Sequence, residues 1–143
     1  VWYTTGKTIS QHNRETQAVP PRYEALTITL TYADRQALYA RIDQRVDEMM
    51  KHGLVKEIQA LLAAGIPKDG TAMQAIGYKE FFPYFAGEQS LADCTEKLKQ
   101  ATRNYAKRQL TWFRRQNDAV WLYIDEENVI ERACSLVREF LQN

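Results

Sequence analysis

The pattern of apolar and polar residues predicts a mostly helical chain with two short strands. Residues 23–32, YEALTITLTY, alternate apolar or β-branched positions with polar ones and predict one strand, and residues 119–124, AVWLYI, predict another. Elsewhere apolar residues recur every three or four positions, which is the period of an amphipathic helix. Helices are expected over residues 35–52, 54–64, 78–86, 91–116 and 126–142.

Capping residues mark where several of these helices begin and end. Asp34 and Ser90 each precede a predicted helix, and their side chains can accept hydrogen bonds from its first free N–H groups. Ser90 also opens a capping-box-like S-x-x-D pattern. Gly53 and Gly65 stand where two helices end, a position that favours glycine. Residues 66–77, IPKDGTAMQAIG, are expected to form a loop.

The order of elements predicts an α/β fold, mostly helical in this fragment. Two short strands do not make a stable sheet alone, so further strands are expected upstream of residue 1. The chain opens on VWYTTGKT, without Met and already in mid-pattern, which we interpret as an excerpt from a longer protein. VPPRY at residues 19–23 breaks any helix, because proline lacks an N–H donor and restricts its predecessor. We therefore divide the chain into residues 1–19 and residues 20–143.

Composition narrows the classes of protein. The chain has 143 residues, of which 45% are hydrophobic and 26% charged, and a net charge of +1, so any basic surface must come from local clustering. The two cysteines and two histidines stand at no metal-ligand spacing, so neither a metal site nor a disulfide framework is expected. The expected compartment is the reducing cytoplasm. No apolar run approaches the roughly 18 residues of a membrane span.

A phosphate-binding loop is suggested near the start by TTGKT, residues 4–8. Its first glycine would have to stand at position 1, which is Val1. A turn at the end of a helix is the better interpretation.

Two arginines share a face of the helix predicted at 35–52. Arg41 and Arg45 are four positions apart, and Arg45 falls at the edge of an apolar stripe. The stripe consists of Leu38, Ile42, Val46, Met49 and Met50. A guanidinium beside a buried face needs a partner. The pattern favours a carboxylate, and a phosphate held by both guanidinium groups is the alternative.

The segment 102–116, TRNYAKRQLTWFRRQ, separates into two faces if it is helical. There is no acid from residue 97 to residue 117, and cations collect on one face. They are Arg103, Lys107, Arg108, Arg114 and Arg115. A solvated helix usually alternates Glu with Lys, so the pattern favours an anion or a nucleic-acid backbone over a plain solvated face or a membrane surface. Trp112 and Phe113 fall on the apolar side, where we expect core packing more than base stacking.

Several segments resemble the tRNA dimethylallyltransferase family. Its I-G-Y-[KR] segment, its Y-[LF]-x-G-E segment and its T-R-x-[YL]-A-K-R-Q-x-T-W-[FL]-R signature all stand here in the same order, within residues 73–91 and 101–115. Residues 41–58 are similar to the family helix that carries an arginine pair, and TTGKTISQ is similar to the end of the family's helical insertion. The resemblance covers almost the whole chain.

The resemblance implies a prenyltransferase that acts in tRNA processing. A dimethylallyl group would pass from dimethylallyl diphosphate to the exocyclic amine of the adenosine next to the anticodon. The implied fold is a nucleotide-binding (ATP-type) P-loop α/β core with a helical insertion, whose end would be residues 1–19, and a central channel. The implied enzyme is cytoplasmic and monomeric, binds the anticodon stem-loop and no membrane, and needs Mg²⁺, which this fragment would not itself hold.

Site residues follow from the matched positions alone. Arg41 and Arg45 are expected to contact diphosphate or to order the channel. The family's tRNA-contacting segment matches Gln74, Ala75, Ile76, Gly77, Tyr78 and Lys79. Gly77 allows close backbone approach, Lys79 suits a phosphate, and Tyr78 could stack or pack equally well. The five cations of residues 103–115 are expected to contact phosphate or to line the channel.

The catalytic parts of the family match nothing in this chain. The P-loop, its magnesium-binding hydroxyl and the aspartate taken as general base all lie upstream in the family. No catalytic residue and no metal ligand is therefore assigned, and the fragment alone is expected to be inactive. From the residues alone, a stand-alone basic helical RNA-binding module without catalysis is the alternative.

Overall fold

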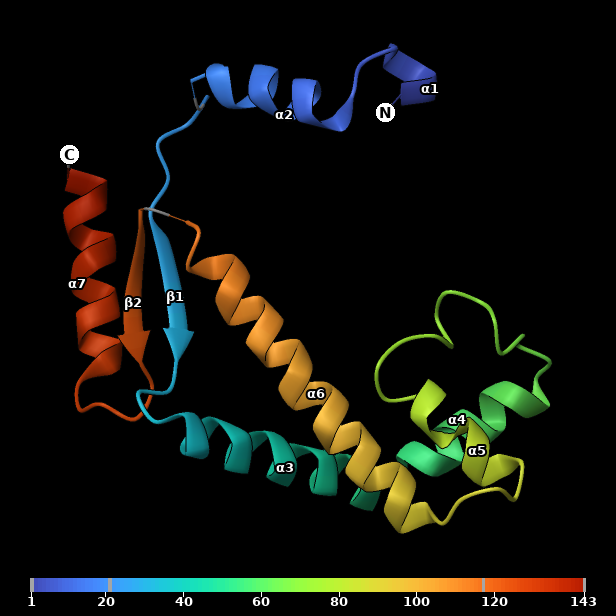
Figure 1. Ribbon diagram of the computed structural model, residues 1–143. Coiled ribbons are helices and arrows are strands. Elements are labelled where there is room, and N and C mark those ends of the chain that lie inside the picture. The colour runs from blue at the N-terminus through green and yellow to red at the C-terminus, as the bar shows by residue number, and fades with distance from the viewer. Residues whose placement is uncertain (1, 21, 117, 143) are drawn as a thin grey trace.

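The computed structural model describes residues 2–20, 22–116 and 118–142, apart from the side chain of Gln17. Pro21 of the predicted break at 19–23 and Asn117 at the end of the acid-free run lie outside the described residues. From residue 27 onward, helices and a pair of strands follow one another in the predicted order, and two helices that the sequence pattern did not predict precede them (Figure 1). In chain order they are α1 (Trp2–Thr5), α2 (Ile9–Ala18), β1 (Thr27–Thr31), α3 (Arg35–Lys51), α4 (Leu54–Ala63), the 3-10 helix η1 (Lys79–Phe81), α5 (Phe82–Phe85), α6 (Leu91–Phe113), β2 (Ala119–Tyr123) and α7 (Val129–Gln142).

Both predicted strands form, and they pair in parallel. The register runs from Thr27 beside Ala119 to Thr31 beside Tyr123. Strand β1 is shorter than the predicted 23–32, because its first residue pairs with Ala119 and the residue before Ala119, Asp118, lies in a turn. Side chains alternate between faces, so Thr31 and Tyr123 point towards α6 while the buried Leu122 points the other way, towards α7.

The predicted caps are confirmed on α3 and α6. The Asp34 carboxylate accepts hydrogen bonds from the backbone N–H groups of Gln36 at 2.9 Å and Ala37 at 3.3 Å. Ser90 accepts from the backbone N–H of Asp93 at 3.1 Å and donates its hydroxyl to the Asp93 carboxylate at 2.7 Å. Strand β1 leads through a short turn into α3, and α3 packs against α6.

A hydrophobic core fills the space between α3, α4, η1 and α6. Its buried members are Val46, Leu54, Ile58, Met73, Phe81, Cys94 and Leu98. These residues come from four predicted helices and from the loop at 66–77, which is a series of turns. The core therefore fixes the N-terminal half of α6 and leaves its C-terminal half to lie along the sheet (Figure 1).

The TTGKT segment is a turn between two helices, as predicted. Gly6 has a φ of 64° and donates its N–H to the Trp2 carbonyl at 2.8 Å, which ends α1. The Thr8 hydroxyl accepts from the Gln11 N–H at 3.2 Å and caps α2. Figure 1 shows α1 and α2 as an arm that stands away from the sheet. The division at residue 19 stays a prediction.

Candidate nucleic-acid interface

Ion pairs hold α6 against α3. Arg103 donates to the Asp43 carboxylate of α3, and its side chain is only 19% exposed. One turn earlier, Lys99 Nζ lies 2.8 Å from Asp47 Oδ1, and this hydrogen bond raises the pKa of Lys99. The α6 sequence carries no acid beyond its first two turns, but α3 supplies carboxylates to it. Arg103, predicted to contact phosphate, therefore has its charge compensated within the protein.

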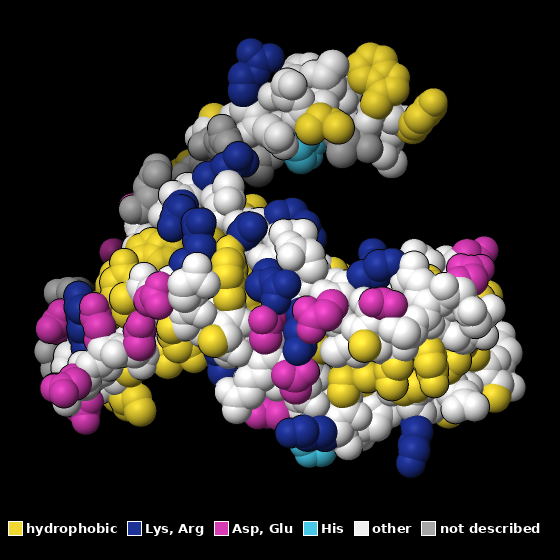
Figure 2. All heavy atoms as spheres, turned by 60° about the horizontal axis from the view of Figure 1, so that its bottom comes forward, with side chains coloured by type: hydrophobic (Ala, Val, Ile, Leu, Met, Phe, Trp, Pro, Cys, Tyr) yellow, Lys and Arg dark blue, Asp and Glu magenta, His cyan; other side chains and the backbone are white. Residues whose placement is uncertain are grey.

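The other four predicted cations are exposed and surround the C-terminal end of α6. They are Lys107, Arg108, Arg114 and Arg115. Lys107 Nζ lies 5.8 Å from the centre of the Tyr39 ring, and the Arg108 guanidinium lies 5.5 Å from that of Tyr105. Within the described parts of the chain, none of the four is ion-paired to a carboxylate. Figure 2 shows a group of Lys and Arg side chains in the hollow beneath the N-terminal arm.

Trp112 does not lie in the core, so that prediction is wrong. Its side chain is 57% exposed, and its ring meets the edge of the half-buried Phe113 ring with centroids 5.0 Å apart. The helical wheel places Trp112 on the apolar side of α6, but the sheet beside this end of α6 is only two described strands wide and does not cover it.

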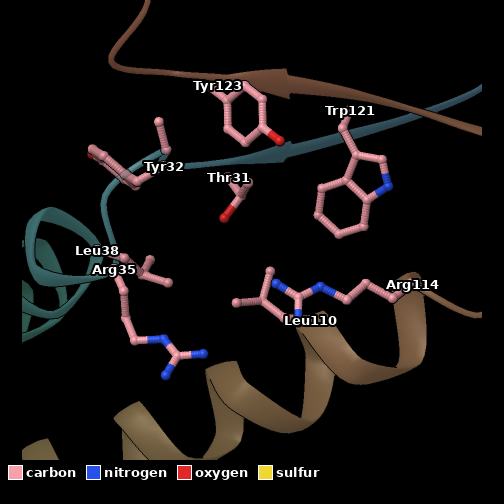
Figure 3. Close-up of a pocket in the computed structure, with 9 residues that line it drawn as sticks. Thr31, Tyr32, Arg35, Leu38, Leu110, Arg114, Trp121 and Tyr123 are labelled. Carbon is pink, nitrogen blue, oxygen red and sulfur yellow. The ribbon is translucent and has the colours of Figure 1, made fainter.

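A cavity of about 460 Å³ lies where the carboxyl ends of β1 and β2 face α6 (Figure 3). Its lining combines cationic and aromatic side chains with Leu38, Leu110 and Thr31. The cations are Arg35 at the start of α3 and Arg114, and the aromatic residues are Tyr32, Trp121 and Tyr123. A smaller cavity of about 230 Å³ shares Arg35, Leu110 and Arg114 with it and adds Lys107.

Sequence reasoning missed Arg35, Trp121 and Tyr123. A signal was available, because the carboxyl ends of parallel strands meet at one edge of a sheet, where α/β proteins bind ligands. Arg35 follows the end of β1 by four residues, and Trp121 and Tyr123 lie in the last three residues of β2.

Arg41 and Arg45 lie on α3 away from this cavity. Arg41 Nη1 is 3.9 Å from Glu48 Oε1, a long ion pair with the expected kind of partner. Arg45 was predicted at the margin of a buried face, but it is exposed, because the apolar stripe turns towards Ile42 and Val46. No ion pair is recorded for Arg45 among the described residues. The structure does not bring the arginine pair together with the cations at the end of α6.

Residues 74–79 lie at the opposite end of α6, beside α4 and α5 (Figure 1). Gly77 is buried, has a φ of 114° and donates its N–H to Glu80 Oε2 at 2.8 Å. Tyr78 packs against the core and donates its hydroxyl to the Glu57 carboxylate, and this hydrogen bond raises the pKa of Tyr78. Both observations favour packing over base stacking for Tyr78. Lys79 is exposed at the start of η1.

The other three residues of this segment, 74–76, differ in exposure. Gln74 is exposed and donates its side-chain amide to the Lys68 carbonyl at 2.7 Å. Ala75 is exposed and Ile76 is half-buried against the core. Gln74, Ala75 and Lys79 are therefore the exposed residues of this segment.

Neither a metal centre nor a membrane span is present in the described part of the chain. No group of three or more His, Cys, Asp and Glu residues there could hold a metal ion. No helix there is both long enough and apolar enough to cross a bilayer.

The fold and the site define a class of protein: an α/β chain with a cationic, aromatic surface at the carboxyl ends of parallel strands, the kind of surface that contacts phosphate groups. The family model described as IPP transferase matches residues 1–116. The chain therefore belongs to the IPP transferase family.

Known proteins agree with this assignment. A tRNA dimethylallyltransferase of Lactobacillus johnsonii is 48% identical over 96% of this chain and 44% of its own length. One from Thermoanaerobacter sp. is 48% identical over 99% of this chain and 45% of its own length. The crystal structure of a tRNA isopentenylpyrophosphate transferase from Staphylococcus epidermidis superposes with a TM-score of 0.76, at 35% identity, over 99% of this chain and 46% of that one. The chain thus spans less than half the length of these relatives.

Proposed function

We propose that this chain is the C-terminal part of a tRNA dimethylallyltransferase. The full-length enzyme would transfer a dimethylallyl group from dimethylallyl diphosphate to the exocyclic amine of the adenosine next to the anticodon. The observation that carries the proposal is the 48% identity, over nearly the whole chain, with proteins of that name. The exposed cations at the end of α6 support it, because they suit a nucleic-acid backbone. A stand-alone RNA-binding module is not favoured.

The described residues divide the work in this proposal. Lys107, Arg108, Arg114 and Arg115 contact phosphates of the anticodon stem-loop, and the turn at 74–79 contacts it at the other end of α6. Arg41 and Arg45 face the diphosphate, whose departure builds negative charge that cations stabilise. Residues 1–19 end the helical insertion. The part of the enzyme outside this chain supplies the P-loop, the general base and the Mg²⁺ site. The full-length enzyme acts as a monomer in the cytoplasm.

The direct test is transfer of labelled dimethylallyl from its diphosphate to tRNA by the full-length protein. A variant with Lys107→Gln, Arg108→Gln and Arg115→Gln should bind tRNA at least about tenfold more weakly, with a flatter dependence on salt, because each lost phosphate contact lowers the slope by roughly 0.7 to 0.9. Lys56→Gln, which removes an exposed cation from α4, is the matched control. Equal salt slopes in the variant and the wild type would reject the assignment of these cations to phosphate.

A further inference from the structure

The cavity at the strand ends carries positive charge, and no carboxylate among the described residues forms an ion pair with its cations. Arg35 comes from α3, and Lys107 and Arg114 come from α6, and together they line the two adjoining cavities. No Asp or Glu is among the lining residues of either cavity. Like charges on α3 and α6 repel one another, so an anion bound between these cations would lower the free energy of the arrangement.

Two carboxylates, one adjacent to Arg35 in sequence and one from the loop after β2, hydrogen-bond to the backbone around Arg35. Asp34 caps α3. Asp125, in the loop after β2, accepts a hydrogen bond of 2.9 Å from the backbone N–H of Ala33. This hydrogen bond lowers the pKa of Asp125, so the carboxylate stays charged and holds the turn. Arg35 therefore follows a turn between β1 and α3 that both carboxylates stabilise.

The opposite wall of the cavity is aromatic. In Figure 3 the strands contribute one side of the cavity, with Thr31, Trp121 and Tyr123. Helix α6 contributes the other side, with Leu110 and Arg114. Trp121 and Tyr123 are half-buried, so their rings are held in place and still reachable. Aromatic rings beside cations are the combination that binds single-stranded nucleic acid, with a base on the ring and a phosphate on the cation.

We propose that this cavity is a subsite for one unpaired nucleotide of the tRNA anticodon loop, with its base against Trp121 and Tyr123 and its phosphate between Arg35 and Arg114. The volume of about 460 Å³ falls within the range of small-ligand sites. Lys107, which lines the adjoining cavity on α6, would contact the next phosphate of the RNA strand. The inference rests on the proposed function, because that function supplies the RNA strand.

The test uses the full-length enzyme and a synthetic anticodon stem-loop. Arg35→Gln should weaken binding of the stem-loop about five- to tenfold and lower the salt slope by roughly 0.7, as loss of one single-strand phosphate contact requires. Trp121→Leu should weaken binding about tenfold with an unchanged salt slope, because stacking carries no charge. For both variants the KM for tRNA should rise while the KM for dimethylallyl diphosphate stays the same. Arg35→Lys should restore most of the affinity.

Controls separate the subsite from general effects. Arg138→Gln removes an exposed arginine from α7, on the far side of the sheet. It should change neither the KM for tRNA nor the KM for dimethylallyl diphosphate. Trp121→Leu could unfold β2, so the wild-type enzyme is also cross-linked to a stem-loop that carries 4-thiouridine beside the target adenosine. Mass spectrometry should place the cross-link on Trp121 or Tyr123.

The outcomes distinguish this inference from the proposed function. A wild type that neither binds nor modifies tRNA overturns both. A wild type that modifies tRNA, but whose Arg35→Gln variant binds like Arg138→Gln and whose cross-links lie outside residues 121–123, overturns the subsite alone.

Discussion

Arg103 and Lys107 are one turn apart on α6, and their surroundings differ completely. Arg103 faces α3 and is held by Asp43, whereas Lys107 lies beside the Tyr39 ring and lines a cavity. The helical wheel assigns both to one cationic face. At residue scale the function of a cation thus depends on the neighbouring helix, which the local pattern does not contain.

Arg103 should therefore act on stability more than on tRNA affinity. A double-mutant cycle of Arg103→Gln and Asp43→Asn, followed by urea unfolding of the full-length protein, should give a coupling of about 1 kcal/mol, since the pair is only partly buried. Arg108→Gln should leave the free energy of unfolding nearly unchanged but weaken tRNA binding. If Arg103→Gln lowers the salt slope as much as Arg108→Gln does, and costs no stability, Arg103 contacts phosphate after all.

The hydrogen bond from Tyr78 to Glu57 makes the free energy of unfolding depend on pH in the alkaline range. It raises the pKa of Tyr78 above its ordinary value of 10.0. The folded protein then keeps a proton that the unfolded chain loses, so this stabilisation is fully present below about pH 10 and is lost as the pH rises through the folded pKa.

Replacing Tyr78 with Phe should therefore lower the free energy of unfolding near neutral pH, and its deficit relative to wild type should shrink above about pH 10. Urea unfolding at several pH values measures the difference. Tyr3→Phe, at a fully exposed ring on α1, should show no such dependence. A deficit for Tyr78→Phe that stays constant up to about pH 11 would contradict the assigned hydrogen bond.

Helix α6 connects the two halves of the molecule. Its 23 residues span about 35 Å, from the core beside η1 to the start of β2. Its N-terminal half is buried through Cys94 and Leu98, while its C-terminal half presents the exposed cations. An element anchored at one end can thus carry a binding surface at the other.

The Ser90 cap stabilises the anchored end. Ser90→Ala leaves the Asp93 N–H without its acceptor and should lower the free energy of unfolding by about 1 kcal/mol. Ser90→Asn keeps a capping oxygen and should recover most of the loss. Chemical denaturation measures both. Equal stability of the Ala and Asn variants would show that the cap contributes nothing, and tRNA binding under folding conditions should be unchanged in either case.

At the scale of the whole molecule, the sheet is narrow and leaves apolar side chains uncovered. Leu30 on β1 is 58% exposed, and Ile130 and Leu141 on α7 are 74% and 76% exposed. Parallel sheets are normally covered on both faces and continue through further strands. Several exposed apolar residues thus lie around the sheet and α7.

The isolated chain 1–143 should therefore associate and transfer no dimethylallyl group. Exposed strand edges and apolar side chains favour aggregation, so the chain should bind a hydrophobic dye and elute as oligomers in gel filtration, whereas the full-length protein should do neither. Lys or Glu in place of Leu30 should reduce association of the isolated chain. A monodisperse fragment that transfers the group to tRNA would contradict the prediction.

Much of this organisation could be predicted from local pattern. The alternation at 27–31, the apolar periods of the helices and the caps at Asp34 and Ser90 all depend on neighbours a few residues away, and each is found in the structure. The exposure of Arg45 and Trp112 was predicted wrongly. Arg45 is exposed because the buried face of α3 turns towards Ile42 and Val46, and Trp112 is exposed because two described strands do not cover it; a helical wheel shows neither.

The sequence by itself determined the order of the elements after residue 20, the caps at Asp34 and Ser90, the cationic character of α6 and, through its signature segments, the family. Only the tertiary structure decided which cations are free, because a carboxylate on α3 reaches Arg103 across 60 residues of chain. It also decided that Arg35, Arg114, Trp121 and Tyr123 share one cavity. Spacing along the chain governs short-range structure, whereas charge compensation and cavities arise from contacts between segments that only folding brings together.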